Sequence, residues 1–373
     1  MNRDVAQKSV PLNSSRSRIH GLRLSLSKHR ADALLVTHLP NIRYVCGFSG
    51  SAAILLVESS RAILFTDSRY TLQAREEVHD ASVVIARHGL LRALGEMLQT
   101  GRRRGRLRLG YAPAQLTVAQ KDALQSIAGA RVRWVPAPNE VERLRAVKDA
   151  SELILMREAA HLISDVWTAA LRHIKPGVSE LAVAAELERA MKLRGASGPS
   201  FDTIVASGPR SAWPHAQPTP KLLKKNELVV LDQGAILRGY CSDMTRTVFL
   251  GRAAGRVREL YSAVLEAQQA AKAAIRPGAK ASDVDSAARK VLRRHGLVRY
   301  FTHSTGHGLG IEVHEVPRLG AAEETLLEEG MVITVEPGVY IEGLGGIRIE
   351  DDVVVTAQGA QDLTTASRDF LEL

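Results

Sequence analysis

The chain has only two cysteines among its 373 residues, so it has neither a disulfide framework nor a cysteine-based metal or redox motif. Aromatic residues are also scarce, at 4%, and aliphatic side chains must therefore form the core. No apolar run approaches the ~20 residues that span a bilayer, and no apolar block follows the polar first residues. These absences predict a cytoplasmic protein without a membrane segment or a secretion signal.

Basic residues exceed acidic residues by 50 to 40, which gives a formal net charge of +10. The excess is spread along the chain, apart from a run of arginines between Arg102 and Arg108. Nucleic-acid-binding domains concentrate such charge on one face or in a recognisable motif. The run lies beside a strand-like segment and is typical of a solvated turn, so we expect no nucleic-acid partner.

The length allows two or more domains of about 150 residues each. Residues 1–15 are polar, have nothing to bury, and are predicted to be a disordered leader. Residues 16–138 alternate between helix-like and strand-like segments, which predicts a smaller α/β domain. Its predicted helices include 19–28 and 114–127, and its strands include 33–36, 53–57, 62–65 and 82–85. Two prolines within 136–139 end this pattern, so residues 139–373 form a second domain.

The second domain repeats a pattern of two helices followed by a buried strand. The predicted helices span 149–174 and 179–194 in the first half, and 256–275 and 282–294 in the second. The Pro-Gly stops at Pro176 and Pro277 are 101 residues apart, as are Gly195 and Gly296. Apolar runs that end in carboxylate-x-Gly follow each helix pair, over 228–234 and 332–338. This predicts one α/β domain of two similar halves, with helices outside a central sheet.

Four carboxylates stand at the strand ends of the two halves. If a turn lies at residues 237 and 238, Asp232 and Asp243 face each other across a hairpin. Glu336 and Glu350 flank a glycine-rich turn and can face each other across a second hairpin. Each like-charged pair at about 4 Å costs on the order of 4 kcal/mol at an effective dielectric of about 20. Protonation relieves that repulsion, but two divalent cations relieve it at neutral pH and gain binding energy.

His307 is a fifth candidate ligand of the same site. His303 lies four residues before it, but the surrounding glycines favour a loop or strand over a helical zinc motif. Carboxylate and imidazole donors without a thiolate suit manganese, cobalt, iron or zinc. The sequence therefore predicts a dinuclear site for a hard or borderline metal.

Several motifs in order resemble one known family. These are Asp232-Gln-Gly-Ala, Gly239-Tyr-Cys-Ser-Asp243-Met-Thr-Arg-Thr, Thr305-Gly-His307-Gly-Leu-Gly, Glu312-Val-His314-Glu-Val-Pro317, Val335-Glu336-Pro-Gly and Gly346-Ile-Arg348-Ile-Glu350-Asp. They resemble the Xaa-Pro peptidases of the M24 (creatinase/prolidase/methionine aminopeptidase) family. Residues 41–50 and 65–70 also look like that family's amino-terminal domain, which methionine aminopeptidases lack.

The resemblance implies a pita-bread catalytic domain preceded by a creatinase-like amino-terminal domain, and two divalent metal ions, manganese first, with cobalt, zinc or iron as alternatives. Asp243 and Glu350 would bridge both ions, Asp232 would bind one, and His307 with Glu336 the other. The resemblance also places four residues in the substrate pocket: His215, His303, His314 and Arg348. Family members are often dimers, so a homodimer is expected.

Together, site and resemblance indicate hydrolysis of the bond between an amino-terminal residue and a penultimate proline, by a hydroxide that bridges the metals. We expect His314 to stabilise the oxyanion, Glu336 to relay the proton, and His215 with Arg348 to position the substrate. The substrates would be Xaa-Pro dipeptides or short peptides, which leaves dipeptidase and aminopeptidase both open. A creatinase-like C–N hydrolase and a metal-free, non-catalytic binding protein are the alternatives, and the full ligand set counts against both.

Overall fold

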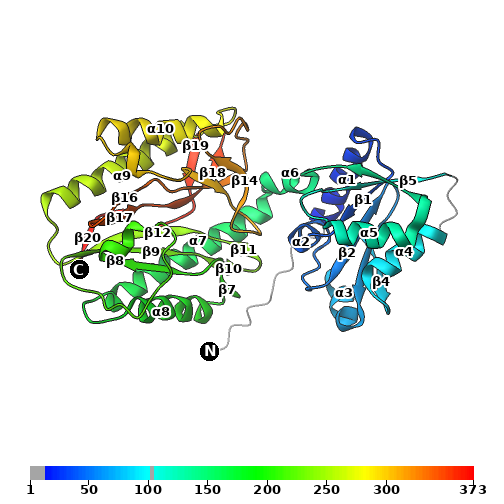
Figure 1. The fold of residues 1–373 in the computed structure, drawn as a ribbon, viewed down its shortest axis with the longest axis horizontal. Coiled ribbons are helices and arrows are strands. Elements are labelled where there is room, and N and C mark those ends of the chain that lie inside the picture. Colours follow the sequence, from blue (N-terminus) through cyan, green and yellow to red (C-terminus); the bar gives the residue numbers. More distant parts are fainter. Residues whose placement is uncertain (1–12, 101–104) are drawn as a thin grey trace. The chain divides into compact units, whose positions relative to one another are not determined.

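The computed structural model describes residues 13–100 and 105–373 of the chain and divides into two compact units, Met1–Arg145 and Ala146–Leu373 (Figure 1). Most of the predicted leader, residues 1–12, and three arginines of the basic run, residues 102–104, lie outside the described part. Within the described part, no helix combines the length and apolar character that crossing a bilayer requires.

The amino-terminal unit is built on a six-stranded mixed sheet in the order β4-β3-β2-β1-β5-β6. Strands β1, β5 and β6 run parallel, whereas β1, β2 and β3 are joined antiparallel. The strands are β1 (Ala33–Val36), β2 (Ala53–Glu58), β3 (Ala62–Asp67), β4 (Ser82–Ala86), β5 (Leu107–Tyr111) and β6 (Val132–Pro136). The four strands that the sequence predicts in this region are confirmed.

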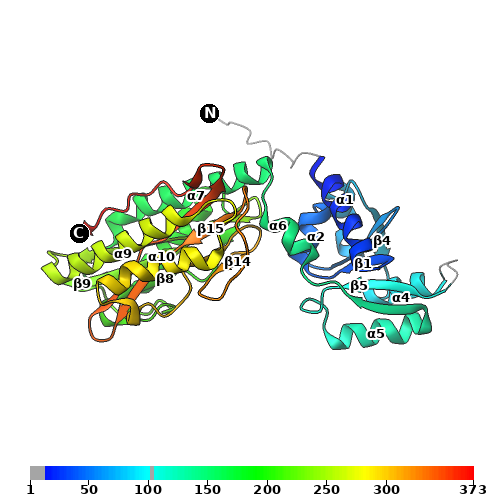
Figure 2. The same ribbon diagram turned by 90° about the horizontal axis from the view of Figure 1, so that it is seen from above.

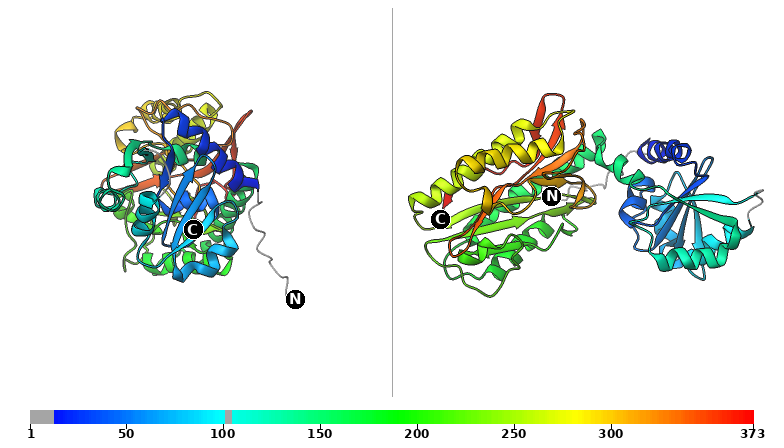
Figure 3. Two further views of the ribbon diagram at one scale, coloured as in Figure 1. Left: turned by 90° about the vertical axis from the view of Figure 1, so that its right-hand side faces the viewer. Right: turned by 45° about the horizontal axis from the view of Figure 1, so that its top comes forward.

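Helices cover both faces of this sheet (Figure 3). Leu94 and Leu124 of α4 and α5 pack with Leu56 and Leu109 of the strands, and α1 and α2 pack on β2. Two of these helices were not predicted: α2 is short and has a proline in its first turn, and α4 buries few of its residues. The helices are α1 (Asn13–Lys28), α2 (Leu39–Cys46), η1 (Ser68–Tyr70), α3 (Thr71–Glu77), α4 (Leu90–Thr100), α5 (Val118–Ala128), η2 (Gly129–Arg131) and α6 (Glu140–Ala146).

The carboxy-terminal unit contains the four long helices that the repeat predicts. Asp149 begins the first of them with a capping box to Glu152, and the Ser179 hydroxyl accepts from the backbone N–H of Ala182 at the start of the second. The helices are α7 (Ala150–Ala170), η3 (Leu171–His173), α8 (Glu180–Leu193), η4 (Gly208–Ala212), α9 (Gly255–Ala274), α10 (Ala281–Arg294) and η5 (Val298–Tyr300). The first predicted helix changes to a 3-10 turn after Ala170.

Two larger and two smaller sheets lie between the helix pairs. The larger ones have the orders β20-β12-β9-β8 and β14-β13-β15-β18-β19, and the smaller ones β11-β10-β7 and β16-β17. The strands are β7 (Gly198–Pro199), β8 (Ile204–Ser207), β9 (Glu227–Gln233), β10 (Ala235–Leu237), β11 (Tyr240–Cys241), β12 (Met244–Leu250), β13 (Gly306–Gly308), β14 (Glu315–Leu319), β15 (Val332–Val335), β16 (Gly338–Ile341), β17 (Gly345–Arg348), β18 (Asp351–Thr356), β19 (Gly359–Asp362) and β20 (Leu371–Glu372).

Each helix pair packs on the sheet of its own half. Helices α7 and α8 share a buried core with β8, β9 and β12, and α9 and α10 share another with β15 to β18. Helices α9 and α10 run side by side along the second half (Figure 2). The predicted arrangement of two halves with helices outside the strands is therefore confirmed.

Candidate metal centre

The four acidic side chains meet where the two halves of the carboxy-terminal unit join. The backbone N–H of Glu350 donates to the carbonyl of Thr245 (3.1 Å), and the Thr245 hydroxyl donates to Oε2 of Glu350 (2.7 Å). These bonds join β12 of the first half to the residues between β17 and β18 of the second. The acidic side chains are close enough to repel one another across this junction of the two halves. Repulsion acts on Asp243 from Glu350, Asp232 and Glu336, and on Glu350 from Glu336 and Asp232. The predicted convergence of four carboxylates is present in the fold.

The turn of the first hairpin lies one residue later than predicted, so the pairing is shifted by two residues. Asp232 lies opposite Thr245 and not opposite Asp243, which stands two residues before Thr245 and directly before β12. The turn consists of Arg238 and Gly239, both with positive φ (49° and 87°), whereas the prediction placed it one residue earlier. A two-residue hairpin turn of this kind favours glycine at its second position, and that preference moves the turn by one residue and the partner of Asp232 by two. Asp232 and Asp243 are therefore diagonal neighbours on one face.

The second hairpin has the predicted register. Strands β16 and β17 pair Gly338 with Arg348, and strands β15 and β18 pair Val335 with Asp351. Both ladders follow one continuous register, so Glu336 and Glu350, which lie between them, face each other. The prediction for this pair is confirmed.

His307 is held on β13 with one ring nitrogen aimed at the acidic group. Its Nδ1 donates to the carbonyl of Gly308 (3.0 Å), which leaves Nε2 as the unprotonated nitrogen of the neutral ring. Nε2 lies 3.7 Å from Oδ2 of Asp243 and 3.8 Å from Oε1 of Glu336. Burial lowers the pKa of His307 to about 4, so the ring is neutral at pH 7 and can act as a ligand.

Burial and mutual repulsion dominate the electrostatics of the acidic group. Burial raises the pKa of Asp243 well above its usual range, and the neighbouring Glu350 raises it further. Burial likewise raises the pKa of Glu350, with Glu336 as the next cause. Burial raises the pKa of Glu336 from 4.5 to about 8, although Arg348 acts in the opposite direction. The metal-free site is therefore unfavourable for four ionised carboxylates.

The donor set fits divalent cations. Oδ1 of Asp232 and Oδ1 of Asp243 are buried and accept no hydrogen bond from any described residue. One ligand atom each from Asp243, His307 and Glu350 lie within 4.8 Å of one another. Buried carboxylate oxygens without hydrogen bonds are costly unless a cation binds them, and oxygen plus imidazole donors suit manganese, iron, cobalt or zinc.

Without metal, the protein should lose stability as the pH rises from about 6.5 to about 8. Glu336 has a pKa of about 8 in the folded state and 4.5 ordinarily, so the folded state binds more protons over this range and its stability falls with rising pH. His303 and His307, whose pKa burial lowers from 6.5 to about 4, act in the opposite direction mainly below pH 6.5. Thermal unfolding of chelator-treated protein should give a Tm at pH 8 that is lower than at pH 6.5 by roughly 2 °C or more. Manganese added at pH 8 should restore it, and a metal-free Tm that rises over the same range would contradict the prediction.

Arg348 is buried beside the acidic group and uses its whole guanidinium. Nη2 donates to Oδ2 of Asp232 (2.7 Å), and Nε donates to the Thr245 hydroxyl (3.0 Å). Nη1 donates to the Tyr340 hydroxyl (2.6 Å) and to the carbonyl of Pro214 (3.2 Å). The arginine thus connects the acidic group to the segment that precedes His215.

His303 is held in the same network. Its Nδ1 donates to the carbonyl of Ser304 (2.8 Å), and its Nε2 accepts from the Tyr340 hydroxyl (2.9 Å). Burial lowers the pKa of His303 to about 4, with the charge of Arg348 as the second cause. The His303 ring is therefore neutral at pH 7. Its Nδ1 lies 4.0 Å from Oε2 of Glu336.

His314 and His215 complete the predicted pocket set. The ring of His314 packs edge-on against His307, with centroids 4.4 Å apart. Burial lowers the pKa of His314, and His215 lowers it further, which places the two side chains within electrostatic range. All nine residues that the sequence analysis names as site residues therefore belong to one region of the carboxy-terminal unit.

Three residues of this region were not predicted. Thr245 and Tyr340 are bound by Arg348, and Asp352 accepts a hydrogen bond at Oδ2 from the backbone N–H of Asp243 (3.0 Å). Asp352 is two residues after Glu350, and Thr245 is two residues after Asp243, so each lies on the same strand face as a predicted site residue. The spacing in the sequence is therefore sufficient to predict both. Tyr340 is not two residues away from any predicted site residue. It reaches the site by its contact with Arg348 across the β16–β17 hairpin.

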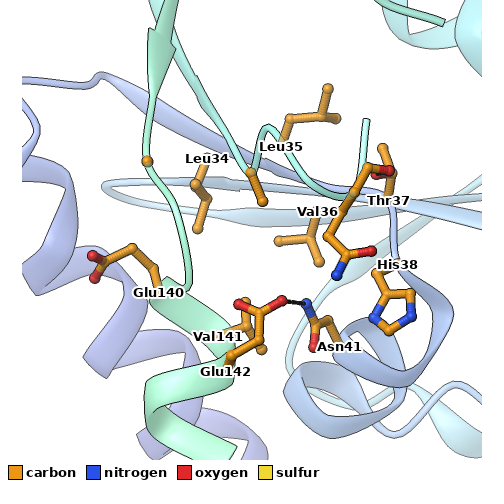
Figure 4. Close-up of a pocket in the computed structure, with 12 residues that line it drawn as sticks. Leu34, Leu35, Val36, Thr37, His38, Asn41, Glu140, Val141 and Glu142 are labelled. Atoms are coloured by element: carbon orange, nitrogen blue, oxygen red, sulfur yellow. Dashed lines mark hydrogen bonds between the residues drawn. The ribbon is translucent and has the colours of Figure 1, made fainter. Parts of the chain in front are cut away.

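A separate pocket lies in the amino-terminal unit, at the carboxyl ends of the parallel strands β1, β5 and β6 (Figure 4). Asn41 and Glu142 line it and are hydrogen bonded at 2.8 Å. None of the nine predicted site residues is among the described residues that line it. It is therefore distinct from the acidic group.

The sequence of the catalytic half decides the family. The profile of metallopeptidase family M24 matches residues 154–357, which cover all nine site residues. The chain belongs to family M24. A second profile, the creatinase/prolidase N-terminal domain, matches residues 18–147. Both parts of the resemblance described above are confirmed.

Similar proteins extend this match over nearly the whole chain. An Xaa-Pro dipeptidase of Pyrococcus horikoshii is 35% identical over 93% of this chain and 96% of its own length. The structure of an Xaa-Pro dipeptidase from Bacillus anthracis has a TM-score of 0.92 at 36% identity, covering 96% of this chain and all of that one. An X-Pro aminopeptidase from Thermotoga maritima has a TM-score of 0.86 at 35% identity, with 95% and 100% covered.

This M24 chain is thus an enzyme, a peptidase of the M24 type. Its two-domain fold matches those of prolidases, so the predicted pita-bread domain with a creatinase-like amino-terminal domain is confirmed. The family acts with divalent metals, in agreement with the cluster of Asp243, His307 and Glu350.

Proposed function

We propose that this M24 peptidase hydrolyses the bond between an amino-terminal residue and a penultimate proline. The observation that carries the proposal is the buried group of four carboxylates and His307, with carboxylate oxygens that lack hydrogen bonds, beside three further histidines and a buried arginine. Similar proteins named Xaa-Pro dipeptidase and X-Pro aminopeptidase support the choice of substrate.

Five residues would hold two divalent ions, for which we propose manganese first and cobalt, zinc or iron as alternatives. Asp232, Asp243, Glu336 and Glu350 would offer carboxylate oxygens as ligands, and His307 would offer its Nε2 nitrogen. When bound, such ions supply Lewis acidity and make water a nucleophile at neutral pH.

The chain's own residues would move the proton and steady the developing charge. Glu336 would take a proton from the attacking water and pass it to the departing proline nitrogen. Burial lowers the pKa of His314, so its neutral ring has one N–H to donate to the carbonyl oxygen as negative charge develops there.

Substrate recognition would fall to the remaining basic residues. His215, His303 and Arg348 would orient the peptide, with Arg348 acting on the pocket wall through Pro214 and Tyr340. A bond before proline has no N–H on its nitrogen, and the ring fixes φ, so a close-fitting pocket can select this bend. We propose dipeptides or short Xaa-Pro peptides as substrates.

Three further proposals concern the domain boundaries, the oligomeric state and the location of the protein. We propose a leader of residues 1–15, an amino-terminal domain of 16–138 and a catalytic domain of 139–373. We also propose a homodimer, because the resemblance to the family implies one. Both cysteines are buried and are not joined in a disulfide, which supports our proposal of a cytoplasmic location.

Purified protein should be stripped with a chelator, dialysed, and supplied with manganese, cobalt or zinc in turn. We expect manganese to restore cleavage of Ala-Pro, Ala-Pro-Ala or both, and not of Ala-Ala or Ala-Gly-Ala. The ratio of kcat/KM for Ala-Pro to that for Ala-Pro-Ala distinguishes a dipeptidase from an aminopeptidase. Metal-loaded protein that cleaves neither proline peptide would contradict the proposal.

A further inference from the structure

His215 lies on the segment of residues 208–218, here called the His215 loop, in which exposed residues alternate with buried ones such as Ser211 and Ala216. The loop leaves β8 at Ser207, forms the short helix η4, and ends before Thr219. His215 itself is exposed, so its own packing does not fix its position. Contacts elsewhere in the loop must therefore hold the histidine toward the acidic group.

The inner side of the loop rests on the site already described. Nη1 of Arg348 donates to the carbonyl of Pro214 (3.2 Å), and the backbone N–H of Gly346 donates to the hydroxyl of Ser211 (2.9 Å). These contacts orient the middle of the loop. They do not hold its two ends together.

One carboxylate, that of Glu180, joins the two ends. Its Oε1 accepts from the backbone N–H (2.9 Å) and the hydroxyl (2.8 Å) of Ser207. Its Oε2 accepts from the backbone N–H (3.1 Å) and the hydroxyl (2.7 Å) of Thr219, and from Nε of Arg210 (3.3 Å). The residues directly before and after the loop are thus bound to the two oxygens of a single side chain.

Hydrogen bonds offset the cost of burying the Glu180 side chain. The side chain is fully buried (0% exposed), and both of its oxygens accept several hydrogen bonds. It also stands in the first turn of α8, where the helix dipole stabilises an anion. Nζ of Lys221 adds a contact to the Ser207 hydroxyl (2.5 Å). Helix α8 therefore offers a rigid anchor for the loop.

The second half of the domain uses a similar arrangement. Asp285 on α10 accepts at Oδ1 from the backbone N–H (3.2 Å) and the hydroxyl (2.8 Å) of Thr305. Arg289 contacts Asp285 (2.7 Å) and donates to the carbonyl of His303 (2.6 Å). However, the carbonyl of Thr305 also accepts from the backbone N–H of Glu336, so this anchor is tied to a proposed metal ligand. The anchor at Glu180 touches none of the proposed ligands.

We propose that Glu180 is a positioning residue, which holds the ends of the His215 loop so that His215 is already placed when substrate binds. The inference rests on the proposed function, because it assigns His215 to substrate binding. A loop that is held before binding loses less conformational entropy when the peptide arrives. Releasing an end should therefore weaken substrate binding and leave metal binding unchanged.

Two pairs of variants test this. Thr219→Val removes the hydroxyl donor and keeps the shape, and Thr219→Ser keeps the donor. Glu180→Gln removes the charge, and Glu186→Gln is the matched change on the same helix, where Glu186 contacts Arg189 and His173 instead of the loop. The readouts are KM and kcat for Ala-Pro, manganese affinity by calorimetry, and hydrogen exchange of the amides in residues 208–218.

We expect Thr219→Val and Glu180→Gln to raise KM about 5- to 20-fold, with kcat changed by no more than about 3-fold and manganese affinity unchanged. Exchange in residues 208–218 should be at least about 5-fold faster in both. Thr219→Ser and Glu186→Gln should resemble the wild type. If Glu180→Gln does not fold, the Thr219 pair gives the answer alone.

Wild-type KM and wild-type exchange in Thr219→Val would overturn the inference. So would a rise in KM with an equal loss of manganese affinity, since that indicates general damage to the domain. If the wild type cleaves no proline peptide, the proposed function fails, and the exchange rates still decide whether the anchor holds the loop.

Discussion

Replacing Asp243 by asparagine is expected to lower metal affinity by at least about 10²-fold and kcat/KM for Ala-Pro by at least about 10³-fold. Oδ1 of Asp243 is buried and accepts no hydrogen bond from the described part of the chain, and Oδ2 lies 3.7 Å from Nε2 of His307. The amide has the same shape but no charge, and its NH2 group cannot bind a cation. Calorimetric metal titration and steady-state kinetics with manganese measure the two effects.

The same substitution should make the metal-free protein more stable. Burial raises the pKa of Asp243, and Glu350 raises it further, so the ionised side chain is unfavourable without a cation. Removing its charge should increase the free energy of unfolding at pH 8 by about 1–3 kcal/mol, measured by urea denaturation in chelator. Asp165→Asn, at an exposed position on α7, is the matched control and should change neither quantity. Wild-type metal affinity in Asp243→Asn would remove Asp243 from the proposed ligand set.

Replacing Arg348 by lysine should lower kcat/KM by about 10²-fold although the positive charge is kept. The guanidinium makes four hydrogen bonds in different directions, to Asp232, Thr245, Tyr340 and Pro214. A lysine has one flexible ammonium group and cannot reach all four partners, so at least one buried partner loses its hydrogen bond. Kinetics with Ala-Pro and urea denaturation should show lost activity together with about 2–4 kcal/mol of lost stability.

Arg256→Lys is the matched control for that variant. Arg256 is exposed near the start of α9, and the change to lysine there should leave activity and stability within error of the wild type. If Arg348→Lys keeps activity within about twofold, the directional bonds of the guanidinium do not matter and its charge alone is sufficient.

The two hairpins show how far pairing can be predicted from sequence. The register of Glu336 and Glu350 was predicted correctly, because several glycines mark the turn between them. For Asp232 and Asp243 the turn was placed one residue too early and the pairing was therefore wrong by two residues, because the turn uses Arg238 at a positive φ, which its residue type does not indicate. A shift of two residues is even, so both aspartates stay on one face and the acidic group still forms.

Residues that contact the site only through another side chain or loop could not be predicted from the sequence. Tyr340 contacts Arg348 and His303 across a hairpin, and Glu180 reaches both ends of the His215 loop from a different helix. Each contact joins positions far apart in the chain. A side chain's periodicity within its own element carries no information about such a partner.

The sequence by itself determined the chemistry: carboxylates at matched strand ends, one histidine among glycines, and a repeat of 101 residues together indicated a two-half domain with a site for divalent metal. Only the tertiary structure decided which atoms face one another, that Arg348 binds four partners at once, and that Glu180 holds the loop of His215. The physical reason is that apolar periodicity and turn residues act locally along the chain, whereas the pairing of buried charges depends on how the two sheets meet. A buried charged or polar group without a partner raises the free energy of the folded state, so these groups are buried together with their partners.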